Sequence, residues 1–251
     1  MNFIQPLSKH WRGVVSLLCL LTLWQLIVSL CQIAPYILPG PLRVFATIMH
    51  NHHLLLMETL PTAVESITGL LLASVIGIFA AIVLIYFPIL RLWLLPSLII
   101  SQALPTFAIA PLLVLWLGYG LASKIITVMI MLFFPITTAF YDGLSRIQTG
   151  WFDLAQTMQA SRSTALRYLL IPAALPALAS GLRLAAAGAP LAAIMGEWVG
   201  ASQGLGFLIL NANARLQIDL LFAALVFLVM LALALFFTID KGITCLLSKY
   251  Y

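Results

Sequence analysis

Three ionisable side chains of this sequence lie inside long apolar segments, where a charged group is costly and usually has a function. They are Glu65, Arg183 and Glu197. For Glu65 and Arg183 we favour the simpler interpretation, in which each forms an ion pair or a buried hydrogen bond between helices. Glu197 fits that interpretation, and it fits equally well a functional position that it would share with Trp198 and Asn213.

Other chemistry has little support among the residues. His50, His52 and His53 place three imidazoles within four residues, which is not the usual spacing of zinc ligands. We therefore interpret them as part of a polar outer loop and expect no metal site. No nucleophile–base arrangement and no paired carboxylates indicate an enzyme, and no cofactor is expected. None of the four lysines follows a glycine, so the sequence lacks a P-loop with which to hydrolyse ATP.

The elements that must position these residues are apolar helices. Of 251 residues, 63% are hydrophobic and 8% are charged, whereas a soluble domain has roughly 25% charged residues. About twenty apolar residues are needed to cross a bilayer. This pattern predicts an all-α, polytopic transmembrane bundle, a single domain over residues 1–251. We expect about six spans, at 13–34, 60–87, 92–117, 125–141, 176–199 and 220–239.

The orientation follows from Lys and Arg at the ends of the spans, because cytoplasmic loops are enriched in both. With the N-terminus inside, the outer cations are Arg43, Lys124 and Arg215. The larger cytoplasmic set comprises Lys9, Arg12, Arg91, Arg146, Arg162, Arg167, Lys241 and Lys249. This asymmetry predicts that both termini are cytoplasmic, and it places the polar segment between the fourth and fifth spans in the cytoplasm as well.

That polar segment, 142–172, interrupts the apolar pattern of the chain. Within it, Leu154, Met158, Ala165 and Leu169 recur at nearly helical spacing among Gln, Ser, Thr and Arg residues. Asp153 and Ser161 are residue types that cap helix starts. We therefore expect one or two short amphipathic helices beneath the membrane. Periodicity alone leaves open whether they merely connect two spans or dock on a partner.

The same segment resembles the cytoplasmic loop of the permeases of binding-protein-dependent ABC importers. The family pattern is Glu-Ala-Ala, three residues, Gly, nine residues, then Ile-x-Leu-Pro. Here Asp153 occupies the acidic position, Leu154 the first alanine, Ala155 the second alanine and Gln159 the glycine. The matching stretches read Asp153-Leu-Ala155-Gln-Thr-Met158-Gln159-Ala160-Ser161-Arg162 and Leu169-Leu-Ile171-Pro172. Glycine permits a sharp turn at this position, so Gln159 must form the turn without that freedom.

The resemblance extends over most of the chain. The sulfonate/taurine/nitrate branch of the family is similar at Leu38-Pro39-Gly40-Pro41, at Pro105 to Gly118, and at Gly181-Leu-Arg183, Gly196-Glu197-Trp198 and Gly204-Leu-Gly206. Within that branch, permeases for thiamine pyrimidine precursors are similar at Ser101-Gln102, Trp116-Leu-Gly-Tyr119-Gly120, Glu197-Trp-Val-Gly-Ala-Ser202 and Ala212-Asn213-Ala214-Arg215.

The resemblance implies a type I importer permease in a bacterial inner membrane that forms the path for a small solute. Glu197, Trp198 and Asn213 would be candidates for that translocation path or for its outer gate. Residues 153–172 would be the coupling helix on a separate cytoplasmic ATPase. An extracytoplasmic binding protein would deliver the solute, and a second copy of the chain would complete a homodimer in the lipid bilayer. The solute would be a thiamine pyrimidine precursor. The alternative is a sulfonate or a similar small anion.

Two further questions stay open in the sequence. An ion-gradient-driven secondary transporter is the alternative of another class, although the two halves lack the matched broken helices common in such folds. A stripe of small residues at three- and four-residue spacing predicts close helix packing. It consists of Gly181, Ala185, Gly188, Ala192, Gly196 and Gly200. The contact could lie at a subunit interface or along the path.

Overall fold

The computed structural model describes residues 7–248, except 104, 147–150, 152–154 and 156. Every regular element in these ranges is helical, which confirms the predicted all-α class. In chain order the elements are α1 (Leu7–Leu30), α2 (Pro41–Tyr86), α3 (Pro88–Ala103), α4 (Thr106–Leu117), α5 (Leu121–Ser145), α7 (Arg162–Ala165), the π-helix η1 (Leu166–Leu170), α8 (Ile171–Gly200), α9 (Leu205–Ala214) and α10 (Ile218–Leu247).

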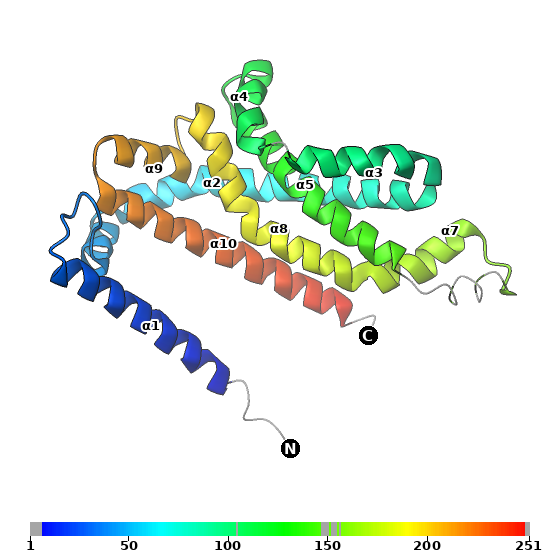
Figure 1. Ribbon diagram of the computed structural model, residues 1–251, viewed down its shortest axis with the longest axis horizontal. Coiled ribbons are helices and arrows are strands. Elements are labelled where there is room, and N and C mark those ends of the chain that lie inside the picture. Colours follow the sequence, from blue (N-terminus) through cyan, green and yellow to red (C-terminus); the bar gives the residue numbers. More distant parts are fainter. Residues whose placement is uncertain (1–6, 104, 147–150, 152–154, 156, 249–251) are drawn as a thin grey trace.

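The molecule is elongated, and α2, α8 and α10 run largely along its length (Figure 1). At one end lie α7 and the turn between α2 and α3, and the C-terminal part of α10 points toward this end. We call this the loop end. At the opposite end lie α9 and the connection from α1 to α2, and we call this the α9 end. The residues of chemical interest are therefore divided between two distant places.

Four helices in the described part of the chain are long and apolar enough to cross a membrane. They are α2, α5, the continuous helical stretch Arg162–Gly200 and α10. Shorter apolar stretches occur at Val15–Leu30, Ala108–Leu117 and Leu205–Ala214. The membrane class of the fold is thus supported, while the number of crossings and the side on which the termini lie remain predictions.

The boundaries differ from the predicted spans in two places. The stretch 92–117, expected to cross as one span, is divided between α3 and α4, with Pro105 as the N-cap of α4. Proline removes a backbone donor and disfavours helical geometry in the residue before it, so a break here is physically reasonable. The histidine-bearing segment, expected as a polar loop, instead belongs to α2 and contains one non-helical residue, Asn51.

The core is formed where α5 packs against α2 and α8. Small residues permit the close approach: a Cβ on Gly181 would lie 2.6 Å from the Cβ of Ala139, and one on Gly196 would lie 3.2 Å from the Cα of Lys124. Both neighbours belong to α5. At these two glycines the small-residue stripe packs on a helix of the same chain, which is neither of the two places considered from the sequence.

Candidate functional site

The loop end contains the segment that resembles the importer motif. Trp151, Ala155 and Thr157 are helical, whereas Asp153 and Leu154 lie outside the described residues. The turn after this helix has Gln159 in the left-handed conformation, with φ of 54°. The N–H of Ala160 donates to the carbonyl of Ala155 at 2.9 Å, as in a Schellman cap. Gln159 thus adopts the kind of backbone geometry that suits the family's glycine.

A second short helix follows this turn. Ser161 is the N-cap of α7, and its hydroxyl accepts a hydrogen bond from the Thr164 N–H at 3.2 Å. This confirms the prediction that Ser161 caps a helix start. The cap turns the chain back toward the bundle, and Arg162 begins the helix that continues into α8.

Between α7 and α8 the helix widens into the π-turn η1, which includes Leu169. Ile171 and Pro172 begin α8 directly afterwards. Because Pro172 has no N–H and its ring crowds the carbonyl four residues earlier, a regular α-helical turn is disfavoured at this point. The closing element of the motif therefore joins the loop to α8 without a flexible linker.

The loop exposes apolar side chains at the end of the bundle. Met158 is 74% exposed, and Tyr168 and Trp151 are exposed too. Ala155, Ala160 and Arg162 help line a pocket of about 350 Å³, whose other wall comes from the junction of α2 and α3. Exposed apolar groups on a polar segment are typical of a surface that a partner covers.

At the α9 end, Glu197 lies 1% exposed among hydrogen-bond donors. Its carboxylate accepts from the Thr62 hydroxyl at 2.6 Å and from the N–H of Gly206. Thr62 in turn accepts from the Leu205 N–H at 2.9 Å, and Glu58 accepts from the N–H of Gly204. The backbone donors at the start of α9 are thus bound by side chains from α2 and α8. We call Glu58, Thr62 and Glu197 the α9 cap.

The candidate gate residues differ in their exposure. Trp198 and Asn213 are both exposed, on α8 and α9 respectively, whereas Glu197 is buried. Sequence reasoning missed the contributions of Glu58 and Thr62 to this site. The available signal was Gly204-Leu-Gly206, because paired glycines before an apolar helix indicate a close approach of another group.

The other two ionisable residues inside apolar segments form ion pairs, as predicted. Glu65 accepts from Lys124 Nζ at 2.9 Å, and both side chains are buried. Arg183 Nε lies 2.6 Å from a carboxylate oxygen of Asp240 and joins α8 to α10. Lys124, counted among the outer cations in the sequence, is 5% exposed, and its charge is paired within the bundle.

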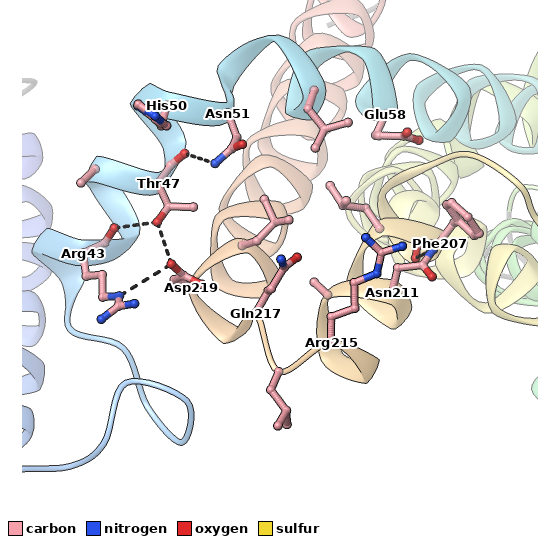
Figure 2. Close-up of a pocket in the computed structure, with 16 residues that line it drawn as sticks. Arg43, Thr47, His50, Asn51, Glu58, Phe207, Asn211, Arg215, Gln217 and Asp219 are labelled. Carbon is pink, nitrogen blue, oxygen red and sulfur yellow. Dashed lines mark hydrogen bonds and ion pairs between the residues drawn. The ribbon is translucent and has the colours of Figure 1, made fainter.

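A polar pocket of about 990 Å³ opens beside the α9 cap. Figure 2 shows Arg43, Thr47 and Glu58 on one wall, from α2, and Asn211 and Arg215 on the α9 wall opposite. Asp219, at the start of α10, contacts the α2 wall. Its carboxylate accepts a hydrogen bond from the Thr47 hydroxyl at 3.2 Å and pairs with Arg43 Nε at 3.6 Å. The sequence did not indicate this pocket.

Comparison with known proteins finds a family model and close relatives. Residues 73–243 match the model described as "Binding-protein-dependent transport system inner membrane component". A Haemophilus influenzae protein named "Probable ABC transporter permease protein" is 48% identical over 88% of this chain and 90% of its own length. A formylaminopyrimidine transport permease of Halalkalibacterium halodurans is 34% identical over 76% of both chains. A structure of a methionine ABC transporter in an inward-facing conformation shares the fold, with a TM-score of 0.68, 21% identity, and coverage of 78% of this chain and 97% of that chain.

Proposed function

This chain belongs to the binding-protein-dependent transport system inner membrane components and is a permease subunit of an ABC importer in a bacterial inner membrane; we propose that its cargo is a thiamine pyrimidine precursor and that residues 153–172 couple it to the ATPase. Family membership implies an ATPase and a binding protein as partners. It also disfavours the ion-gradient-driven alternative. The sequence has no P-loop, so the energy must come from a separate subunit.

The coupling role is supported by the geometry of the loop. Two short helical pieces flank a tight turn at Gln159, and Met158 beside the turn is exposed although it is apolar. A groove on the ATPase would remove that side chain from water. Because Arg162–Gly200 is one continuous helix, a force on the loop acts directly on a helix that extends to the α9 end. This direct connection is the observation on which the proposal depends.

The coupling proposal is tested by binding of the ATPase. Met158→Asp would place a charge in the proposed contact, and we expect association with the ATPase to weaken by tenfold or more, which corresponds to about 1.4 kcal/mol. The matched control is Ser248→Asp, which puts the same charge on an exposed residue at the end of α10. The association of each variant with the ATPase is measured by co-purification from membranes and by titration with the ATPase. Unchanged association of Met158→Asp would overturn the assignment.

We further propose that two copies of the chain form the transporter. One chain of this size offers little wall for a path that opens alternately to each side, and paired subunits are the usual symmetric solution. Co-expression of two differently tagged copies with the ATPase checks this point. Recovery of both tags in one complex supports the homodimer, and recovery of a single permease copy per complex contradicts it.

The choice of cargo is supported by the formylaminopyrimidine permease, which is 34% identical over 76% of this chain. Together with the similarity at Trp116–Gly120 and Glu197–Ser202, this favours a pyrimidine over a sulfonate. The buried cation Lys124 is also neutralised by Glu65, so it does not present a free charge for an anion. The runner-up cargo remains a sulfonate or a similar small anion.

Uptake measurements separate the two cargoes. Cells that lack their own precursor uptake should accumulate a labelled pyrimidine precursor when this chain is expressed with its ATPase and binding protein. Excess taurine should leave that uptake unchanged. Accumulation of labelled taurine, competed by other sulfonates and not by pyrimidines, would instead support the runner-up.

A further inference from the structure

The α9 cap has a geometry that suggests more than the closing of a helix end. Three consecutive N–H groups, of Gly204, Leu205 and Gly206, donate to Glu58, Thr62 and Glu197. A helix start usually binds a side chain of its own segment. Here all three acceptors come from other helices, two of them from α2 and one from α8.

The α9 cap is closely packed. Gly204 has φ of 115°, and a Cβ on either Gly204 or Gly206 would clash with the Glu197 carboxylate. The Thr62 hydroxyl serves two partners, because it donates to Glu197 and accepts from Leu205. Buried hydrogen bonds to a carboxylate are among the stronger ones in proteins. The α9 cap therefore joins the start of α9 to both α8 and α2.

Glu197 belongs to the same continuous helix as the loop. The stretch Arg162–Gly200 has 39 residues, about 58 Å at about 1.5 Å per residue, and it packs through its glycines on α5. The loop is joined to the first turn of this helix and the α9 cap to its last turns. A displacement of the helix at the loop end therefore reaches Glu197.

Helix α9 is also one wall of the pocket in Figure 2. Phe207, Asn211 and Arg215 come from α9 or its end, and they lie opposite α2. The pocket's shape therefore depends on where α9 lies relative to α2, and the α9 cap determines that position at one end of the wall.

We propose that the α9 cap is a positioning element for transport: it transmits displacement of the helix Arg162–Gly200 to α9 and so changes the pocket at the α9 end during the ATPase cycle. This inference rests on the proposed role of the loop. If the cap only stabilised the fold, its loss would lower hydrolysis and uptake together. A transmitting cap instead sets the number of ATP molecules consumed per cargo molecule.

The first experiment measures that ratio in the complete transporter reconstituted with its ATPase and binding protein. Thr62→Val removes the hydroxyl at similar volume, and Thr62→Ser retains it. Thr68→Val is the matched control on the same helix, because the Thr68 hydroxyl bonds to carbonyls of its own helix. We expect Thr62→Val to raise ATP consumed per cargo roughly fivefold or more, near the lower end of site-to-site coupling effects. Thr62→Ser and Thr68→Val should remain near the parent value.

The second experiment follows α9 directly. A single cysteine at Asn211, which lines the pocket, is introduced after Cys19, Cys31 and Cys245 are replaced by serine. Its labelling rate with a membrane-impermeant maleimide is compared with and without ATP and vanadate. We expect the two rates to differ in the parent and to become equal with Thr62→Val. Equal rates in the parent, or a contrast unchanged by Thr62→Val, would overturn the inference.

A second variant of the α9 cap is needed in case Thr62→Val is poorly inserted in the membrane. Glu58→Ala removes a half-buried member of the cap and provides an independent test of both measurements. A proportional loss of hydrolysis and uptake, with the labelling contrast intact, would show that the cap only stabilises the fold. Failure of Met158→Asp to weaken the ATPase contact would overturn the loop proposal, and the Asn211 labelling contrast would report separately on whether α9 moves through the cap.

Discussion

The two ends of the bundle differ in how their key side chains are placed: at one end they are buried with partners, and at the other they are exposed. At the α9 end two carboxylates are buried with partners from this chain: Glu65 pairs with Lys124, and Glu197 accepts hydrogen bonds from Thr62 and Gly206. At the loop end Met158 is exposed, and Gln159 adopts a left-handed conformation on the surface. The α9 end is therefore stabilised within this chain, whereas the loop end presents groups that a second protein can bury.

The largest expected effect is at the buried ion pair of the α9 end. Lys124→Met leaves Glu65 without its partner in a buried site, and we expect a loss of about 3–5 kcal/mol in unfolding free energy. The double variant Lys124→Met with Glu65→Leu should recover much of it, because no lone charge remains. Thermal unfolding in detergent and the level of folded protein measure both. A double variant no more stable than the single one would contradict this account.

A smaller loss is expected from Gly204→Ala. The new Cβ would clash with the Glu197 carboxylate, and the backbone there has φ of 115°, so we expect a loss of about 1–3 kcal/mol. Gly242→Ala is the control, because a Cβ at that position of α10 meets no atom of the described residues within 4 Å. In the same unfolding assay the control should be neutral or slightly stabilising. Equal effects at the two glycines would show that the α9 cap is not tightly packed.

At the loop end we expect Gln159→Gly to strengthen binding of the ATPase by about 1 kcal/mol or less. Gln159→Gly removes the cost of a left-handed conformation for a side-chain-bearing residue. The β-branched variant Gln159→Val should have the opposite effect, because it tolerates that conformation poorly. Affinity for the ATPase, measured by titration, should rise for glycine and fall for valine. Identical affinities for both variants would mean that the turn at Gln159 does not shape the contact.

The smallest effect is expected at the pair Arg183–Asp240, which sharpens the contrast with Lys124. Both of its side chains are about one-third exposed, so breaking it with Asp240→Asn should cost about 1 kcal/mol or less. Ser248→Asn, an exposed position near the same end of α10, provides the control for a surface change. A loss as large as that of Lys124→Met would show that exposure does not govern the strength of these pairs.

The sequence alone determined the features that depend on neighbouring residues. Composition identified an all-α membrane protein, the motif spacing marked residues 153–172, and Ser161 was recognised as a helix cap. The need of Glu65 and Arg183 for partners was also evident, because an unpaired charge in an apolar segment is costly. Each of these conclusions follows from short-range pattern or from solvation, which the local chain already contains.

Only the tertiary structure decided which residues meet across long separations. Lys124 pairs with Glu65 from another helix, the α9 cap joins Thr62 to Glu197 and Leu205, and the small-residue stripe packs on α5. Such contacts depend on how whole helices pack, and residues more than fifty positions apart carry no local signal of their pairing. For that reason the sequence did not indicate that Lys124, in the first turn of α5, is buried and paired with Glu65.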